Sequence, residues 1–166
     1  MSKAFTREDD GTDQPRPRPM PLLPPGVKNF ITAEGCDRLQ AELNALREER
    51  PGLLESSLTD SELRAELAQL DERMNQLERS LASAEVVPVP ASPHDHVRFG
   101  SVVTVRDNRG TEDTYRIVGA DESDFGRHDI SWRSPLAAAV LNARVGQKVT
   151  FRSPAGLTQL EIVAIA

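Results

Sequence analysis

The stretch "LRAELAQLDERMNQLERSLASA", residues 63–84, decides the fold of the first half of this chain. Apolar residues recur in it at alternating gaps of four and three positions, which is a heptad repeat. The residues between these positions are mostly charged or polar, so the stretch predicts an amphipathic helix whose apolar side packs against a second helix. The repeat falls on Leu63, Leu67, Leu70, Met74, Leu77, Leu81 and Ala84.

A second stretch with compatible spacing lies between residues 33 and 53. Its leucines are Leu39, Leu43, Leu46 and Leu53, and Arg50 takes the remaining seam position. Thr32 is expected to cap the start of this helix. Pro51 is expected to kink or break it, because proline removes a backbone hydrogen bond and clashes with the preceding turn.

The two helical stretches are similar in length and are joined by a few polar residues near 57–60. Equal arms and a short joint predict an antiparallel coiled-coil hairpin over residues 30–86, because each apolar seam then covers the other. The alternative is a seam that pairs with a second molecule, as in a dimeric coiled-coil adaptor. The short joint favours pairing within the chain, so we expect a monomer.

The pattern changes to β-strands after "VVPVPASPHD". "VRFGSVVTVRD" and "EDTYRIVG" alternate apolar and polar residues around a turn, and "QKVTFRS" and "LTQLEIVAI" form a second hairpin. "ISW" is a short strand, and "PLAAAVLNA" is a short helix with proline at its first position. The sequence therefore predicts an α+β protein: the hairpin, a linker over 87–96, and an antiparallel sheet domain with one short helix over 97–166.

Composition excludes several functional classes. The chain has 166 residues, one cysteine and a net charge of −6. No apolar run approaches the roughly 18 residues of a membrane span, and no signal-peptide pattern is found, so a reducing cytoplasm is expected. Residues 33–93 carry a net charge of −7, which repels nucleic acid phosphates and favours a basic protein partner. Residues 1–29 are polar and proline-rich and predict a disordered arm.

The ordered set of segments resembles the Gre family of bacterial transcription elongation factors, most closely its GreB branch. The resemblance rests on "MSKAFTRE", "LPPGVKNFITAEG", "LQAELNALREERP", "YRIVGADE", "ISWRSP" and "VGQKVTFRSPAG". It implies a coiled-coil hairpin followed by a C-terminal domain of FKBP-like fold. It also implies that this domain docks on RNA polymerase at the secondary channel, with the hairpin entering the channel close to the nascent RNA.

The same resemblance implies a role for the hairpin tip. In the family, acidic tip residues help to hold a catalytic Mg²⁺ at the polymerase active site, and the polymerase then hydrolyses the backtracked transcript. The factor is therefore expected to have no cofactor of its own and no independent enzymatic activity. The family tip reads G-D-x-S-E-N, and Asp60, Ser61 and Glu62 match its D, S and E with one residue missing between Asp60 and Ser61.

Two interpretations of the tip remain open on sequence grounds. Asp60 and Glu62 are the candidate catalytic pair, because carboxylate oxygens suit Mg²⁺. The same residues also fit a capping box, in which Thr59 and Glu62 satisfy each other's backbone N–H groups. Leu63 stands where the family has asparagine, and it belongs to the heptad seam. The hairpin is also about a dozen residues shorter than is usual in the family, so its tip should fall short by roughly 9 Å.

The candidate partner-binding residues lie in "ISWRSP". Ile130, Ser131, Ser134 and Pro135 match the family turn that faces the polymerase, and Arg133 replaces an acidic or amide residue. Ser134 and Pro135 also fit a purely structural role as the cap and first residue of a helix. No intrinsic metal site is expected, because His94, His96 and His128 lack the further ligands that zinc needs.

The function expected from these features is a transcription elongation factor that binds RNA polymerase and modulates elongation, with transcript cleavage possible. A non-cleaving regulator that competes with cleavage factors is the alternative, which the short hairpin and altered tip favour. A prolyl isomerase is disfavoured, because such sites need an aromatic-lined pocket and the C-terminal domain has few aromatic residues.

Overall fold

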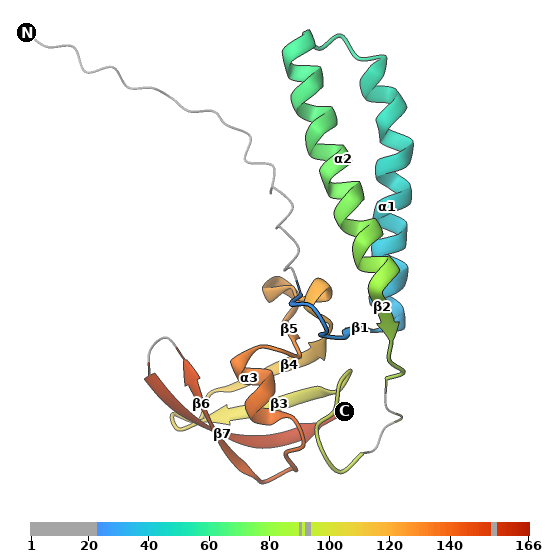
Figure 1. Cartoon of the computed structure of the whole chain (residues 1–166). Helices are drawn as coiled ribbons and strands as arrows, with labels where there is room; N and C mark the ends of the chain where they lie inside the picture. Colours follow the sequence, from blue (N-terminus) through green and yellow to red (C-terminus); the bar gives the residue numbers. More distant parts are fainter. Residues whose placement is uncertain (1–22, 90, 92–93, 154–155) are drawn as a thin grey trace, which may run out of the picture.

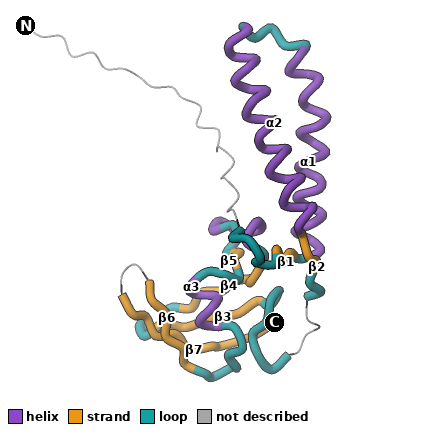
Figure 2. The backbone as a smooth tube through the Cα atoms, in the orientation of Figure 1, coloured by secondary structure: helices purple, strands orange, loops and turns teal. Residues whose placement is uncertain are grey.

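The structure is a computed structural model that describes residues 23–89, 91, 94–153 and 156–166. It confirms the predicted α+β architecture, with a helical hairpin rising from a small sheet domain (Figures 1 and 2). The proline-rich arm predicted for 1–29 falls mainly on residues 1–22, which lie outside the described residues. None of the described helices is long and apolar enough to cross a membrane.

The hairpin consists of α1 (Ala33–Leu54) and α2 (Asp60–Ser83), which pack side by side. The predicted heptad seam provides its core. Burial is strongest in the half nearest the sheet domain, where the buried apolar residues are Ile31, Leu39, Leu43 and Leu77. Toward the tip the seam leucines Leu63 and Leu67 are only half-buried.

Ion pairs between the two helices fix their register. Arginines of one helix meet carboxylates of the other at 2.7–2.8 Å. Each pair is partly exposed and contributes little to stability by itself, but together the pairs disfavour a shifted pairing of the helices. The pairs are Glu42–Arg73, Arg47–Glu78 and Arg50–Asp71. Arg50, the polar residue in the predicted seam, is therefore paired.

Pro51 does not break α1, which continues to Leu54. Of the kink or break expected at Pro51, the structure excludes the break; Pro51 lies in the last turn of the helix. There its missing N–H removes only the bond to the carbonyl of Arg47, and the fixed φ of proline is compatible with a helix. The helix ends at the polar loop 55–59, as the short joint predicts.

A small parallel sheet at the base of the hairpin was not predicted. It pairs β1 (Asn29–Ile31) with β2 (Ala84–Val86). β1 immediately precedes α1 and β2 immediately follows α2, so the chain enters and leaves the hairpin at neighbouring points. The ring of Phe30 in β1 packs against Trp132 of the sheet domain, with ring centroids 5.2 Å apart.

The C-terminal domain is a five-stranded sheet with the strand order β5-β4-β3-β7-β6. Its strands are β3 (Val102–Asp107), β4 (Glu112–Val118), β5 (Asp129–Ser131), β6 (Lys148–Ser153) and β7 (Gly156–Ile165). The sheet is mixed rather than purely antiparallel, because β5 pairs with β4 in parallel. A turn cannot join parallel neighbours directly, and the connecting segment holds the 3₁₀ helices η1 (Ala120–Glu122) and η2 (Phe125–Arg127).

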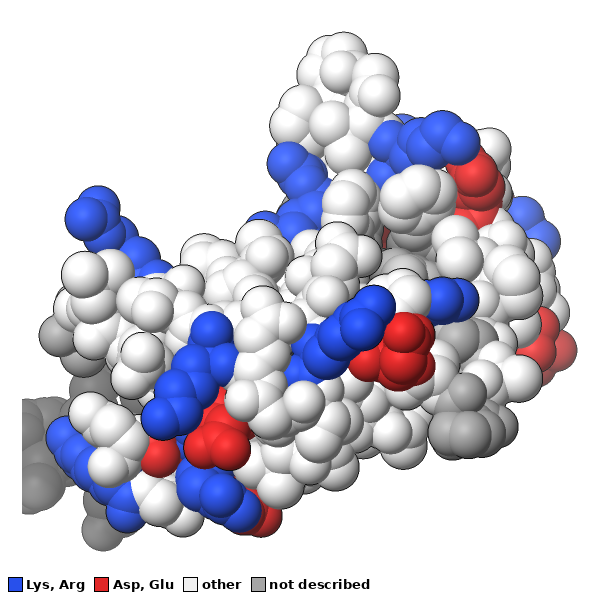
Figure 3. All heavy atoms as spheres, turned by 90° about the horizontal axis from the view of Figure 1, so that it is seen from below, with Lys and Arg blue, Asp and Glu red and all other residues white. Residues whose placement is uncertain are grey.

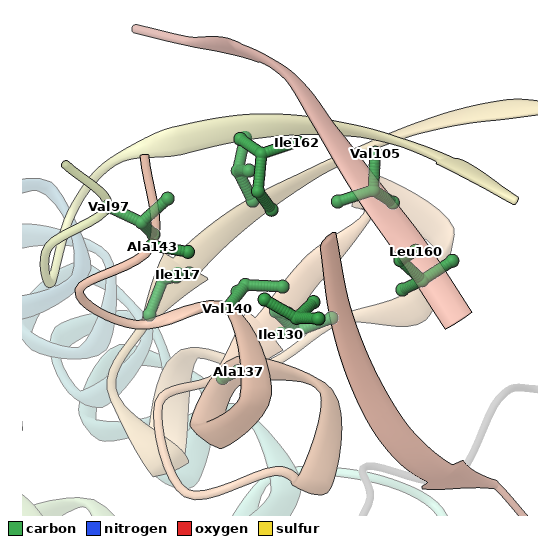
Figure 4. Close-up of a cluster of buried hydrophobic side chains, with 11 residues drawn as sticks. Val97, Val105, Ile117, Ile130, Ala137, Val140, Ala143, Leu160 and Ile162 are labelled. Carbon is green, nitrogen blue, oxygen red and sulfur yellow. The ribbon is translucent and has the colours of Figure 1, made fainter. Parts of the chain in front are cut away.

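The short helix α3 (Pro135–Val140) covers one face of this sheet. Its Ala137 and Val140 are fully buried and meet side chains from the strands (Figure 4). Ile162 in β7 and Ile117 in β4 are likewise fully buried in this core. The domain therefore has a core of its own, separate from the core of the hairpin.

Candidate functional site

The tip of the hairpin is a five-residue loop, 55–59, that ends in a capping box. Thr59 is the N-cap of α2, and its N–H and hydroxyl both donate to Glu62 Oε2, at 3.0 and 2.7 Å. The N–H of Glu62 donates in return to Thr59 Oγ1 at 3.4 Å. The predicted capping box is therefore present, and it gives Glu62 a structural role at the start of α2.

The capping box uses only one carboxylate oxygen at the tip, so the other oxygens of Asp60 and Glu62 stay available to a ligand. Both contacts from Thr59 fall on Oε2 of Glu62, and Oε1 makes no hydrogen bond or ion pair with any described residue. Asp60 is exposed and likewise makes none with the described part of the chain. Capping and metal binding therefore do not compete for the same oxygen.

Helix geometry limits how Asp60 and Glu62 act together. They are the first and third residues of α2, and residues two apart are roughly 200° apart around a helix axis. Their oxygens are hard ligands of the kind that Mg²⁺ takes, but magnesium sites need about six ligands in octahedral geometry. The tip thus fits a contribution to a magnesium site completed elsewhere. Among the described residues no group of three or more His, Cys, Asp or Glu residues is placed to hold a metal ion.

The hydrogen bonds of the capping box also affect the ionisation of Glu62. The Thr59 hydroxyl, and after it the Thr59 backbone N–H, lower the pKa of the Glu62 carboxyl. The charged form is therefore favoured in the folded state. Its stabilising effect is present above the ordinary pKa of glutamate and is lost as the pH falls through the lowered value.

We expect Thr59→Ala to weaken the start of α2 by about 1 kcal/mol, because one N-cap side chain contributes about 0.5–2 kcal/mol. The pKa of Glu62 should rise toward its ordinary value, since the hydroxyl is the larger cause of the shift. Carboxyl chemical shifts followed through a pH titration measure this change. Ser57→Ala in the exposed loop is the control, and an equal rise of the Glu62 pKa in that variant would contradict the assignment.

Two leucines surround the acidic residues at the tip. Leu54 is 54% exposed and Leu58 is 39% exposed, although both are large apolar side chains. The tip therefore combines exposed carboxylates with exposed apolar surface.

The predicted partner-binding residues occupy the connection from β5 to α3. Ile130 is only 6% exposed and points into the core beside Val140, so its side chain serves the fold (Figure 4). Ser134 caps α3, with its Oγ accepting the N–H of Ala137 at 3.1 Å, and Pro135 is the first residue of that helix.

The surface of this connection is formed by the remaining residues. Arg133 and Pro135 are exposed, and Ser131 is half-buried with its Oγ accepting the N–H of Arg133 at 3.2 Å. The Arg133 side chain makes no ion pair with the described residues, so its charge is available to a partner. Of the five predicted residues, Arg133 and Pro135 are therefore the ones that present side chains to solvent.

Charges of both signs are mixed on the side of the domain opposite the hairpin. Figure 3 shows basic side chains spread over this face, with acidic side chains beside several of them. Within the C-terminal half of the chain, Arg106 pairs with Glu112 at 2.6 Å, and Arg144 lies 3.5 Å from Asp95. The described residues on this face therefore form no extended basic surface of the kind that binding to nucleic acid backbones uses.

The three histidines that were considered as metal ligands each contact a side chain of the protein. His94 contacts Ser101 Oγ at 2.7 Å, and His96 contacts Asp95 Oδ1 at 2.6 Å. His128 adopts a left-handed backbone conformation at the end of η2, and its ring lies 5.9 Å from that of Tyr115.

Sequence reasoning missed Glu122, which is 5% exposed and binds the N-terminus of α1. A signal existed in "TAEG": Thr32 has the residue type of an N-cap, but its third following residue is Gly35 instead of the glutamate of a capping box. Gly35 has no side chain that can accept the N–H of Thr32, and in the structure Glu122 accepts it instead.

The fold and the tip together define a protein in which a small α+β domain carries a projecting acidic helical hairpin. The family model described as "Transcription elongation factor, GreA/GreB, C-term" matches residues 92–166. Transcription elongation factor GreA of Legionella pneumophila is 33% identical over 153 residues, covering 83% of this chain and 96% of that protein.

A second relative is transcription elongation factor GreA of Chloroflexus aurantiacus, 36% identical over 150 residues and covering 82% of this chain and 96% of that protein. Among solved structures, GreA factor homolog 1 of Thermus thermophilus matches 84% of this chain and 99% of its own, with 25% identity and a TM-score of 0.40. On the strength of the sequence relatives, the chain belongs to the GreA/GreB family of transcription elongation factors.

Proposed function

We propose that this chain binds RNA polymerase at its secondary channel, with the C-terminal domain docked at the channel mouth and the hairpin inside. Family membership supports the partner. The direct support in the structure is the hairpin itself, which projects from the domain (Figure 1). At its tip, Asp60 and Glu62 Oε1 make no hydrogen bond or ion pair with the described residues. The net charge of −7 over residues 33–93 suits a channel lined by basic groups.

Docking uses the exposed part of the connection between β5 and α3. Arg133 stands where the family pattern has an acidic or amide residue, so the matching polymerase surface must accept a positive charge. A charge of the wrong sign at such an interface costs several kcal/mol. The polymerase that this chain binds is therefore expected to carry an acidic or neutral group opposite Arg133.

At the tip, Asp60 and Glu62 Oε1 are the groups that would reach a magnesium ion of the polymerase. The ion would supply the chemistry by activating water and stabilising the leaving oxygen, and Asp60 and Glu62 would contribute ligands, so the chain would not be an enzyme by itself. The capping box would keep Glu62 in place, with Oε2 bound to Thr59 and Oε1 available.

The test is transcript cleavage and factor displacement on stalled elongation complexes. If the tip is active, Asp60→Ala and Glu62→Ala should each reduce cleavage, whereas Glu66→Ala, an exposed carboxylate one turn farther along α2, should not. Displacement of a known cleavage factor should be unchanged in all three variants, because the docking surface is intact. Failure of the unmodified protein to displace that factor would reject binding at the channel.

A non-cleaving regulator is the second candidate. The observation in its favour is that Asp60 and Glu62 project from different sides of α2, with Glu62 tied to Thr59, which does not form a ready-made chelating pair. The shorter hairpin expected from the sequence also favours a non-cleaving regulator, because catalytic groups lose their effect when they lie about 1 Å from the required position. Displacement without cleavage would identify this function.

The finer assignments are proposals of the same kind. The relatives given above carry the name GreA, so placement in the GreB branch stays a prediction. We also propose a monomeric cytoplasmic protein that contacts nascent RNA only through the polymerase. Sedimentation of the full chain measures the monomer directly, and a dimer mass would instead favour the adaptor hypothesis.

A further inference from the structure

The junction between the hairpin and the C-terminal domain contains a buried carboxylate that the proposed function does not use. Glu122, in η1, is 5% exposed. Its Oε2 accepts the N–H of Gly119 at 2.8 Å and the N–H of Thr32 at 2.9 Å. Its Oε1 accepts the hydroxyl of Thr32. Three hydrogen bonds thus satisfy a group that would otherwise be costly to bury.

Thr32 is the N-cap of α1, so Glu122 acts on the first residue of the hairpin. Thr32 Oγ1 accepts the N–H of Gly35 at 2.9 Å, as Thr59 Oγ1 accepts the N–H of Glu62 at the start of α2. In α2 the glutamate that accepts the N-cap N–H comes from the same helix. In α1 that position is Gly35, and the carboxylate comes from Glu122, 90 residues along the chain. The capping box of α1 is therefore completed by the C-terminal domain.

Gly35 is what makes room for this arrangement. A Cβ atom at Gly35 would lie 1.9 Å from Glu122 Oε1, and the three nearest atoms to it all belong to the Glu122 side chain. Any other residue at this position would push the carboxylate away. The glycine costs helix stability by its backbone freedom, so its presence in the first turn is explained by the contact with Glu122.

Further contacts surround this capping box. Arg38 of α1 lies 3.8 Å from Glu122 and 3.9 Å from Asp129. Glu34 of α1 pairs with Arg116 of β4 at 2.7 Å. From the other arm, the hydroxyl of Ser80 donates to Asp121 in η1. Both helices of the hairpin are therefore held by the same short segment of the C-terminal domain.

We infer that Glu122 is a positioning residue: by completing the capping box of α1, it fixes the direction in which the hairpin leaves the C-terminal domain. The 24 residues of α2 extend roughly 36 Å, so a tilt of about 5° at the junction moves the tip by about 3 Å. The consequence for polymerase rests on the proposed function, because it matters only if the tip must reach a fixed point. The orientation itself is a property of the free protein.

The experiment measures the distance between hairpin and domain in the free full-length chain. Spin labels are placed at Ala65, on the exposed side of α2, and at Asn108, in the turn after β3, with Cys36→Ser removing the native thiol. The unmodified junction should give one narrow distance distribution. Glu122→Ala should broaden it, because both Thr32 contacts are lost.

Gly35→Ala separates positioning from helix stability. Alanine favours the helix over glycine, so an isolated α1 would gain stability from this change. The distance distribution should nevertheless broaden, because the new methyl group displaces Glu122. If Glu122→Ala does not fold, the distance distribution of Gly35→Ala tests the positioning role by itself.

The double variant Gly35→Glu with Glu122→Ala restores a capping box within α1 itself. It should recover the melting temperature lost in Glu122→Ala while the distance distribution stays broad. Ile162→Val is the control for general destabilisation. It removes one methyl group from the core of the sheet domain and should lower the melting temperature without broadening the distances.

Narrow, unchanged distributions in Glu122→Ala or Gly35→Ala would overturn the inference, as would a double variant whose distribution becomes narrow again. Competition with a cleavage factor for polymerase is measured separately on the same proteins. If the unmodified protein fails to compete but the distances change as expected, the proposed function fails and the positioning role stands.

Discussion

Replacing Leu77 with alanine is expected to lower the free energy of unfolding of the hairpin by about 2–5 kcal/mol, the range for removing a buried leucine side chain. Leu77 is 0% exposed and packs with Leu39 and Leu43 of the facing helix. The core of the hairpin contains few other fully buried side chains, so its packing has little to compensate the cavity. Thermal unfolding followed by far-UV circular dichroism measures the loss of helix.

Leu54→Ala is the matched control for this prediction. It removes the same atoms from a leucine that is 54% exposed at the end of α1, so its effect should stay within about 0.5 kcal/mol. The sheet domain should remain folded in Leu77→Ala, because its core is separate. An equal loss in the free energy of unfolding for the two variants would show that burial of Leu77 does not stabilise the hairpin.

Replacing Gly119 with alanine is expected to destabilise the junction by about 1–3 kcal/mol, as overpacking does. The cause is not backbone conformation, because Gly119 has φ −61°, which any residue adopts. A Cβ atom there would lie 2.3 Å from the backbone oxygen of Phe30 and 2.7 Å from Glu122 Oε2. The first contact involves backbone, so β1 itself must shift.

Urea unfolding measures this loss, and the amide chemical shifts of Phe30 and Thr32 report the displacement of β1. Gly52→Ala in the exposed last turns of α1 is the control, since a Cβ atom there meets nothing within 4 Å. Alanine at that position should stabilise the helix by up to about 1 kcal/mol. The two glycine variants should therefore change stability in opposite directions, and the same sign for both would contradict the packing argument.

Much of the hairpin could be predicted from the sequence because its determinants are local. The heptad positions from Leu63 to Leu81 define one face of a helix by spacing alone, and the short polar loop sets the antiparallel partner. The capping box at Thr59 was predictable for the same reason, since its two residues are three apart. Of the kink or break expected at Pro51, the break does not occur, because the fixed φ of proline is compatible with a helix and only the bond to the Arg47 carbonyl is lost.

The features that could not be predicted join residues far apart in the sequence. Parallel pairing of β5 with β4 and of β1 with β2 depends on the three-dimensional path of the chain, which strand patterns do not define. Glu122 looks like an ordinary loop residue in "GADES", and only the structure places it against Thr32. At the tip, residue types predicted the capping box but not that both Thr59 bonds fall on one oxygen of Glu62.

The parallel pair of β1 and β2 has a consequence for how such proteins diversify. Because the chain enters and leaves the hairpin through the adjacent strands β1 and β2, the two helices can change in length without moving their points of attachment. Adding or deleting equal numbers of whole heptads in α1 and α2 changes the distance between the hairpin tip and the C-terminal domain and leaves the β1–β2 pair unchanged. Reach is thus an independently adjustable property of this architecture, open to graded engineering by heptad insertion.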